Sequence, residues 1–293
     1  LSLSLSKEGI NAKTSTQGIT PHVAFLHLFP ASLCLSLSLS HPHTHTPTHN
    51  SSSREEERER ESSGSWEMTG DGAAAAGPYE HPYVPRDLVL PGFVPNFLTI
   101  LDIFTPYATA SLLVVALVWL LSGRSPKLFK TDRVIMCWWA FTGLTHIVLE
   151  GYFAFSPEFY KKKTPHYLAE VWKEYSKGDS RYASRDSAIV TVEGITAVLE
   201  GPASLLAVYA IAAQKPYRYT LQFAVCLGQL YGCLVYFITS YLDGDNFSTN
   251  SYFYWVYYIG ANSSWTVIPT LIAIRSWNKI SAAISMDKNK KMQ

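Results

Sequence analysis

The stretch RVIMCWWAFTGLTHIVLEGYFAF, residues 133–155, is apolar enough to cross a bilayer but carries His146 and Glu150 in its second half. A bilayer core about 30 Å thick needs about 20 helical residues. An ionisable side chain inside a span costs about 2.5–3.5 kcal/mol, so such residues normally face the interior of a helix bundle and have a partner or a task there. His146 and Glu150 are four residues apart, which places both on one face of a helix.

Four further apolar stretches accompany this one. The five predicted spans cover approximately residues 97–121, 133–155, 187–213, 217–242 and 252–276. A soluble all-α protein with five fully buried helices would have too little polar surface to cover them. The sequence therefore predicts an all-α integral membrane protein whose five transmembrane helices form a bundle.

The first 67 residues differ in composition from the rest. They contain no methionine and hold repeats such as LSLSLS at 1–6 and 35–40, HTHT at 43–46 and REEERERE at 54–61. Such tracts are typical of a translated leader, or of a disordered or targeting segment, and we exclude residues 1–67 from the fold. The remaining chain is divided into an N-terminal non-cytosolic segment at 68–96, a five-helix domain at 97–276 and a basic cytosolic tail at 277–293.

Charge and cysteine content exclude several classes of function. Residues 68–293 hold 19 Lys and Arg, 16 Asp and Glu, and three His. This balance does not favour a nucleic-acid partner or a metal cluster. Cys137, Cys226 and Cys233 lie in apolar stretches without a CxxC pattern, which predicts small core residues and no disulfide framework.

The loops predict how the bundle is oriented. Lys and Arg concentrate in the loop at 122–133, in the loop at 214–218 and after the fifth span, whereas 243–251 has none. The positive-inside rule then places the C-terminus in the cytosol. The longest loop, 156–186, carries seven basic and five acidic residues, and its segment YLAEVWKEY suits a short amphipathic helix. Lys290 and Lys291 form either a dilysine retrieval signal of the endoplasmic reticulum or an ordinary basic tail.

Polar side chains occur in three other predicted spans. They are Glu193 in the third span, Gln229 and Tyr231 in the fourth, and Asn262 and Trp265 in the fifth. At 1.5 Å per helical residue, the His–Glu pair, Glu193 and the two residues of the fifth span lie in one slab, roughly 7–20 Å from the non-cytosolic surface. The sequence therefore predicts one pocket that receives these groups from three helices.

Such a pocket favours acid–base chemistry. Burial and mutual repulsion separate the proton affinities of neighbouring carboxyl groups, so one group can give a proton while another accepts one. The ring of Trp265 can stabilise a developing cation, and the sequence of proton addition, cation and proton loss describes the movement of a carbon–carbon double bond. No HExxH pattern, phosphate loop or nucleophile motif is present, so we expect no metal and no cofactor. Polar residues in spans also join helices to one another, which is our alternative for the whole set and our interpretation of Glu200. We interpret Asp102, near the end of the first span, as a residue that reaches the membrane interface.

Five motifs carry a resemblance to a known family. They are THIVLEGYF at 145–153, VWKEYSKGDSRY at 171–182, VEGITAVLEGPASL at 192–205, GQLYGCLVYF at 228–237 and NSSWTVIPT at 262–270. Across approximately residues 82–291 the chain resembles the emopamil-binding protein family, the sterol Δ8–Δ7 isomerases, and specifically a plant member. The resemblance implies a multi-pass protein of the endoplasmic reticulum whose bundle encloses a sterol pocket. It also implies a cofactor-free shift of the C8=C9 double bond to C7=C8, through protonation at C9, a C8 carbocation and proton loss at C7.

The resemblance also implies roles for single residues. His146, Glu150 and Glu193 match the family residues that carry out the proton transfers. Thr196 matches a threonine near them, Asn262 matches an asparagine that orients a catalytic carboxylate, and Trp265 matches a tryptophan that faces the cation. Gln229 and Tyr231 complete the predicted substrate site. The expected partners are a Δ8-sterol in the bilayer, cationic amphiphilic inhibitors and a second copy in a homodimer. Glu200 departs from the family, which has Trp there in animal enzymes. The alternative function is a sterol or cationic-amphiphile binder without turnover, similar to the sigma-2 receptor.

Overall fold

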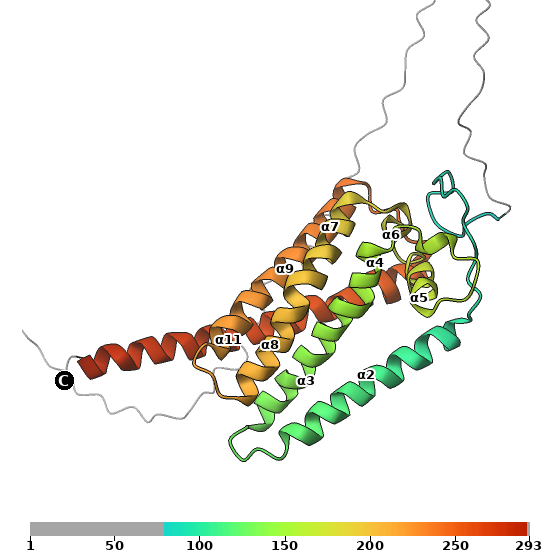
Figure 1. The fold of residues 1–293 in the computed structure, drawn as a ribbon. Coiled ribbons are helices and arrows are strands. Elements are labelled where there is room, and N and C mark those ends of the chain that lie inside the picture. The colour runs from blue at the N-terminus through green and yellow to red at the C-terminus, as the bar shows by residue number, and fades with distance from the viewer. Residues whose placement is uncertain (1–78, 292–293) are drawn as a thin grey trace, which may run out of the picture. The chain divides into compact units, whose positions relative to one another are not determined.

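The computed structural model describes residues 79–291, and within this range the chain forms helices and loops without a strand (Figure 1). The elements are α2 (Ile100–Ser122), α3 (Lys130–Thr145), η1 (His146–Glu150), α4 (Gly151–Phe155), η2 (Phe159–Lys161), α5 (Tyr167–Tyr175), α6 (Arg181–Ser184), α7 (Ser187–Ile195), η3 (Thr196–Glu200), α8 (Gly201–Ala212), α9 (Arg218–Leu242), α10 (Ser251–Phe253), η4 (Tyr254–Ala261) and α11 (Asn262–Lys291). The predictions for residues 1–67 lie outside the described residues.

Four helices are long and apolar enough to cross a membrane. They cover Ile100–Ser122, Lys130–Phe155, Ser187–Ala212 and Arg218–Leu242. These bounds agree with the first four predicted spans to within three residues. The second and third helices are continuous through η1 and η3, so the polar residues inside them do not interrupt the rod. The all-helical fold and four of the predicted spans are therefore confirmed.

The fifth apolar stretch is also helical but differs in character. It begins at Ser251, passes through η4 and continues as α11 to Lys291, whereas the sequence predicted an end near residue 276 and a separate tail. The stretch 252–276 contains four Tyr, two Trp and five Ser or Thr, and these side chains make it less apolar than the other four. It is therefore not one of the four helices that are long and apolar enough to cross a membrane.

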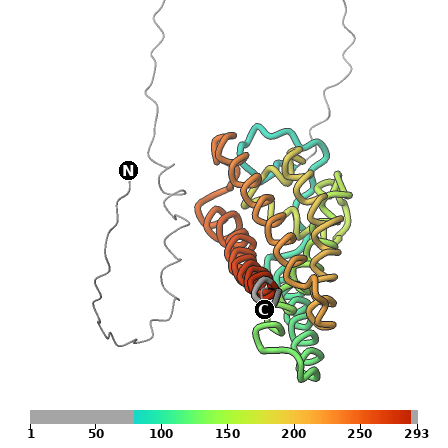
Figure 2. Tube along the Cα trace, turned by 90° about the vertical axis from the view of Figure 1, so that its left-hand side faces the viewer, coloured from blue at the N-terminus to red at the C-terminus, as the bar shows by residue number. Residues whose placement is uncertain are grey.

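The four apolar helices run side by side, and α11 crosses them at an angle on one side of the bundle (Figures 1 and 2). Their packing uses small residues where backbones approach closely. A Cβ at Gly143 would lie 3.0 Å from the Gly201 carbonyl oxygen and 3.1 Å from the Ser204 Cβ, so α3 and α8 meet at this point. Close approach of this kind is how helices associate in a bilayer, where burial of apolar surface no longer drives their contact.

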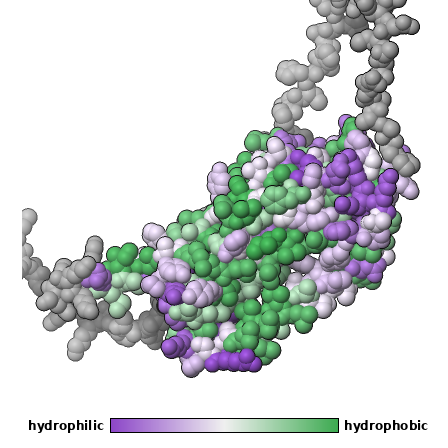
Figure 3. Space-filling view, viewed as in Figure 1, coloured by the Kyte–Doolittle hydropathy of each residue, from purple (hydrophilic) through white to green (hydrophobic). Residues whose placement is uncertain are grey.

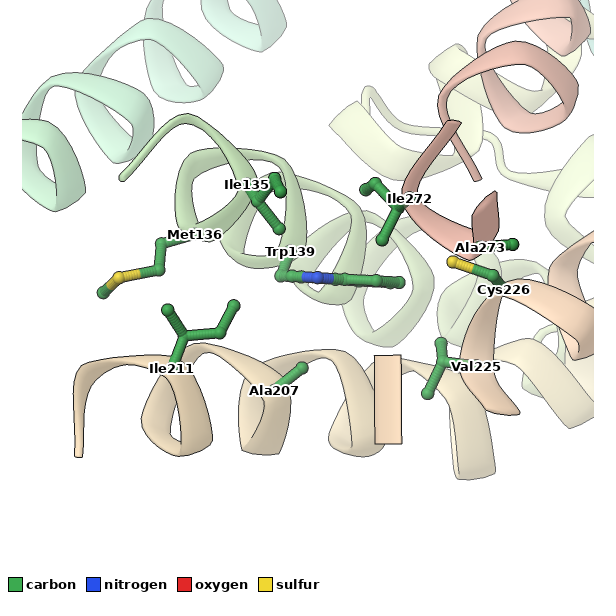
Figure 4. Close-up of a cluster of buried hydrophobic side chains, with 9 residues drawn as sticks. All are labelled: Ile135, Met136, Trp139, Ala207, Ile211, Val225, Cys226, Ile272 and Ala273. Carbon is green, nitrogen blue, oxygen red and sulfur yellow. The ribbon is translucent and has the colours of Figure 1, made fainter. Parts of the chain in front are cut away.

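An apolar cluster fills the bundle on the side away from the loop 156–186. Figure 4 shows Trp139 of α3 pointing into the space between α8, α9 and α11, among Ile211, Val225 and Ile272. Its indole N–H donates to Gln222 Oε1 at 3.3 Å, so its one polar atom is satisfied. Cys226 is also buried there, as the sequence predicted. On the surface, apolar side chains cover the middle of the visible face and polar ones gather toward its ends (Figure 3).

A cap covers the end of the bundle where α4 ends and α7 begins. It consists of residues 79–99 together with η2, α5 and α6 (Figure 1). The predicted amphipathic segment is confirmed as helix α5. Within the cap, Lys173 and Glu170 form a fully buried ion pair of 2.5 Å. Glu170 also accepts from the backbone N–H groups of Phe97 and Leu98, and Lys173 donates to the Pro95 carbonyl, so this pair ties the cap segment 79–99 to α5.

Candidate active site

A cavity of about 480 Å³ lies between the cap and the helices of the bundle. Its wall is formed by α2, the α3–η1 segment, α5, Tyr182 of α6, the end of α7 with the start of η3, α9 and the η4–α11 junction. The lining is largely apolar and aromatic, and its side chains with hydroxyl, carboxyl, amide or imidazole groups are Tyr107, Thr145, His146, Glu150, Glu174, Tyr175, Tyr182, Glu193, Thr196, Gln229, Tyr236, Tyr257, Asn262 and Ser264. Such a size and lining are typical of a site for one small apolar molecule.

His146 and Glu150 form a buried pair on the cavity wall. The His146 Nδ1 atom lies 2.6 Å from Glu150 Oε2, and both side chains are almost fully excluded from solvent. On the other edge of the imidazole, Nε2 lies 2.9 Å from Gln229 Nε2 and 3.2 Å from Thr142 Oγ1. The spacing of four residues thus produces the contact that the sequence predicted.

The third apolar helix, Ser187–Ala212, brings its polar groups to the same place. The Thr196 hydroxyl bonds to Glu150 Oε2 and lies 3.0 Å from the Glu193 carbonyl oxygen. Glu193 lies three residues before Thr196 on this helix, and its buried carboxyl group lines the same cavity. The structure therefore brings together His146, Glu150, Thr196 and Glu193, as expected.

Tyr182 of α6 is a partner of Glu193 that the sequence did not single out. Its hydroxyl donates to Glu193 Oε1 at 2.5 Å. Burial raises the pKa of the Tyr182 phenol well above its usual range, so the hydroxyl keeps its proton and remains a donor. The ring is held by stacking on Trp172, with ring centroids 5.0 Å apart. A phenol from the cap thereby fixes one oxygen of a carboxyl group in the bundle.

Two of the spanning helices contain a π-helical turn at this site. η1 begins at His146 and ends at Glu150, and η3 begins at Thr196 and ends at Glu200. The two turns pack against each other. A π turn places one additional residue in the helix and commonly marks a functional site. His146, Glu150 and Thr196 lie within these two turns, whereas Glu193 precedes η3.

The fifth helical stretch contributes Trp265 and Asn262. The Trp265 ring centroid is 5.9 Å from that of His146, and the ring also contacts Trp138 and Phe141. Trp265 therefore forms part of the cavity wall beside the acid–base pair.

Asn262 differs from expectation. Its amide donates to the Tyr175 hydroxyl at 3.1 Å and to the Tyr258 carbonyl at 2.8 Å. Neither partner is a carboxylate, so Asn262 does not orient Glu150 or Glu193 directly. The positions next to the two groups are taken by tyrosines of the cap, since Tyr175 of α5 accepts from Asn262 and contacts the ring of Tyr182, which bonds to Glu193.

Gln229 and Tyr231 separate although they are close in sequence. Gln229 is buried and contacts His146 and Thr142, whereas Tyr231 is 71% exposed on the outside of α9 and does not line the cavity. Two residues two positions apart on a helix differ by about 200° in direction. The prediction that both contact the substrate is therefore wrong for Tyr231.

Other polar groups lie as follows. Thr142, which the sequence reasoning missed, is four residues before His146 and was detectable by the same spacing rule. Asp102 caps the start of α2 through Thr99 and is exposed, which agrees with its interpretation as a residue at the end of the span. Within residues 79–291, no three His, Cys, Asp or Glu side chains are grouped so as to hold a metal ion.

Comparison with known proteins gives the relatives of this chain. Residues 167–276 match the family EBP, described as EXPERA (EXPanded EBP superfamily). A protein of Oryza sativa subsp. japonica named "Probable 3-beta-hydroxysteroid-Delta(8),Delta(7)-isomerase" is 65% identical over 214 residues, which cover 73% of this chain and 98% of the rice protein. A protein of Arabidopsis thaliana with the same name is 65% identical over 209 residues, 71% of this chain and 93% of its own length. The protoglabretal synthase of Ailanthus altissima is 54% identical over 212 residues, 72% of this chain and 97% of its own length.

Proposed function

The chain belongs to the EBP family, in which plant 3-beta-hydroxysteroid-Δ8,Δ7-isomerases are among its relatives, and we propose that it moves the C8=C9 double bond of a Δ8-sterol to C7=C8. The single observation that carries the proposal is the buried chain of His146, Glu150, Thr196 and Glu193 on the wall of an apolar cavity. A double-bond shift needs a proton donor and a proton acceptor within one apolar site, and this chain of groups supplies both.

The proposed reaction conserves every atom of the sterol. The π electrons of C8=C9 take a proton at C9, which leaves a carbocation at C8. A base removes one proton from C7, and the electrons of that C–H bond form the C7=C8 bond. Glu150 and Glu193 serve as the acid and the base, because both buried carboxyl groups line the cavity, and neighbouring buried carboxyl groups favour one protonated and one ionised form.

The other residues support this chemistry. His146 donates to or accepts from Glu150 at 2.6 Å and so shares its proton. Tyr182 holds Glu193 Oε1 in place, and Thr196 holds Glu150. The ring of Trp265, beside His146, faces the C8 cation and stabilises it by its negative π face. Gln229 sets the position of the imidazole rather than contacting the sterol.

The proposed setting is the membrane of the endoplasmic reticulum. The four apolar helices make the chain a membrane protein, and the fifth helical stretch completes a five-helix bundle around a sterol pocket. Arg275 of α11 pairs with Asp132 of α3 at 2.5 Å, close to the basic loop 122–133. This pairing supports our placement of that end, and of the C-terminus, in the cytosol.

The same site suits cationic amphiphilic inhibitors. A protonated amine in the cavity imitates the C8 cation, and the carboxyl groups and Trp265 would attract it. A protein that only binds sterols or amines would need the cavity but not the paired acid and base. The complete Glu150–Glu193 arrangement therefore favours the enzyme over the binder. The homodimer expected from the sequence stays a prediction.

Complementation tests the proposal. We expect the chain to restore Δ7-sterols in a yeast strain that lacks its own sterol isomerase, with the sterols identified by mass spectrometry. Persistent Δ8-sterols in cells that express the protein well, together with retained binding of amines, would favour the binder instead. Purified protein incubated with a Δ8-sterol in deuterated water should place one deuterium at C9, which reports the protonation step directly.

A further inference from the structure

The cavity has a second polar region, at the cap, that the proposed reaction does not use. Three of the residues that line the cavity carry carboxyl groups, and two of them, Glu150 and Glu193, form the proposed acid and base. The third is Glu174 of α5, which is only 7% exposed. Burying a charged group is costly unless the group is paired, so the partners of Glu174 are informative.

The Glu174 carboxylate has one close partner and one distant one. Its Oε2 atom forms an ion pair of 2.6 Å with Lys177, three residues later. Among the described residues, its Oε1 atom has a single hydrogen-bond partner, the Tyr257 hydroxyl, at 3.4 Å. An O–H···O hydrogen bond normally spans about 2.5–3.0 Å, and an ionised carboxyl group has about four acceptor positions. Glu174 therefore keeps unused acceptor capacity on the wall of the cavity.

Close packing fixes the position of this region. The neighbouring residue Lys173 is held in a fully buried ion pair that ties α5 to the segment 79–99. Tyr257 of η4 packs against the end of α5, where a Cβ at Gly178 would lie only 2.5 Å from the Tyr257 Cβ. The Tyr257 ring also stacks on Tyr175, with the two ring planes 13° apart. The carboxylate thus belongs to a rigid part of the cap.

A row of three tyrosine rings separates Glu174 from the reacting groups. The Tyr175 ring centroid lies 6.2 Å from that of Tyr257, which bonds to Glu174. On its other side, the same centroid lies 5.0 Å from that of Tyr182, which bonds to Glu193. All three tyrosines line the cavity. A molecule that fills the cavity therefore meets carboxyl groups at two separate places, with aromatic wall between them.

A Δ8-sterol also needs polar groups at two separate places. Its 3β-hydroxyl group is on ring A, whereas the reacting atoms C7, C8 and C9 all belong to the adjoining ring B. A hydroxyl group without a partner in apolar surroundings costs free energy, which keeps the hydroxyl group of a bilayer sterol at the polar surface. The cap covers the end of the apolar helices (Figure 1), so a hydroxyl group beside Glu174 stays near that surface.

We propose that Glu174 recognises the 3β-hydroxyl group of the sterol, which donates a hydrogen bond to Glu174 Oε1. Ring A then lies along the tyrosine row, and ring B lies beside Glu150 and Glu193. Glu174 determines which sterols are accepted and takes no part in the proton transfers. The inference deepens the proposed function and rests on it.

Substrates and variants of the full chain together isolate this hydrogen bond. Three Δ8-sterols differ only at C3: the 3β-alcohol, its methyl ether, which cannot donate, and the 3-deoxy compound. Glu174→Leu removes the acceptor, and Glu174→Gln keeps the shape with a neutral acceptor. Glu158→Leu is the matched control, because Glu158 also pairs with a lysine three residues later, Lys161, but on the exposed surface of the cap. We would measure kcat/KM and Kd for each protein with each sterol.

We expect the wild type to prefer the alcohol over the ether and the 3-deoxy sterol by roughly 10–100-fold in kcat/KM, the range for one hydrogen bond to a charged group. This preference should disappear in Glu174→Leu, because activity falls for the alcohol alone and the 3-deoxy sterol reacts as fast as in the wild type. Glu174→Gln should keep a preference of roughly 2–10-fold, the range for a neutral hydrogen bond. Glu158→Leu should match the wild type with every sterol.

Two results would overturn the inference. One is an equal preference for the alcohol in the wild type and in Glu174→Leu. The other is a loss in Glu174→Leu that is equally large for all three sterols, which indicates a structural role only. If the wild type converts none of the sterols, the proposed function fails, and the Kd values of the alcohol and the 3-deoxy sterol in the two proteins still decide whether Glu174 binds the hydroxyl group.

Discussion

Removal of a single oxygen atom, by Tyr182→Phe, tests whether the cap takes part in the chemistry. The Tyr182 hydroxyl donates to Glu193 Oε1 at 2.5 Å inside a buried site. The substitution keeps the ring, which contacts Trp172 and Phe153 with centroids 5.0 Å away in each case. Packing should therefore survive, and the loss should be confined to one hydrogen bond.

The structure allows the magnitude to be worked out. A hydrogen bond to an ionised group contributes about 1.5–3 kcal/mol. Each 1.36 kcal/mol of transition-state stabilisation is about tenfold in rate. If Glu193 must be ionised and fixed during proton transfer, Tyr182→Phe should lower kcat by roughly 10–100-fold. The KM should change little, because the lost oxygen bonds to an enzyme group and not to the sterol.

The assay is the conversion of a Δ8-sterol by purified protein in single-turnover conditions, with products separated by mass spectrometry. Tyr160→Phe is the matched control, because it removes a phenol oxygen from the same cap without breaking a side-chain hydrogen bond to the site. A Tyr182→Phe variant as fast as the wild type, or a Tyr160→Phe variant that loses as much, would refute the assigned role. A fall in melting temperature for Tyr182→Phe alone would instead identify the bond as structural.

Three further outcomes follow from the geometry. Glu150→Gln and Glu193→Gln should each abolish turnover while the protein still accumulates in membranes, as shown by complementation and immunoblotting; growth rescue by either would remove it from the acid–base pair. Trp265→Ala should weaken the binding of sterol-like amines roughly 2–30-fold, equivalent to about 0.5–2 kcal/mol of lost cation–π interaction, and an unaltered Kd in a displacement assay contradicts this. Lys173→Met should destabilise the protein by about 3–5 kcal/mol, because it leaves Glu170 charged and buried. Lys161→Met is the control and should leave the melting temperature unchanged, because its ion pair is exposed. Equal effects of the two variants on thermal unfolding would contradict the importance of the buried pair.

The parts of the fold that depend on chain-local patterns were predictable. Span length and apolar composition located four helices, and the spacing of His146 and Glu150 predicted their contact. The depth argument also brought Glu193 to the same site, because a helix rises by a constant distance per residue. These inferences need only the geometry of single helices and the thickness of a bilayer.

The remaining parts depend on tertiary structure. The loop 156–186 is polar and irregular, so nothing local indicates that Tyr182 turns inward to meet Glu193. Asn262 could not be assigned its partners, because Tyr175 reaches it from the cap. The error at Tyr231 had a different origin: the directions of side chains around α9 were not compared, although a helical turn of 100° per residue separates it from Gln229. The end of the fifth helix was missed because the polar residues after 276 also suit a loop.

The π turns at η1 and η3 make helix length a tightly constrained quantity in this protein. Each turn accommodates one residue more than an α-helix would need, so removing a single residue there, even an apolar one such as Val148 or Val198, would let the rod relax to α geometry. The helix beyond the cut would keep its register, but the spacing within the turn would change, so that His146 and Glu150, for example, would be three residues apart instead of four. Outward-facing apolar side chains of these turns, such as Val148 and Val198, are open to replacement, whereas the number of residues in each turn is not.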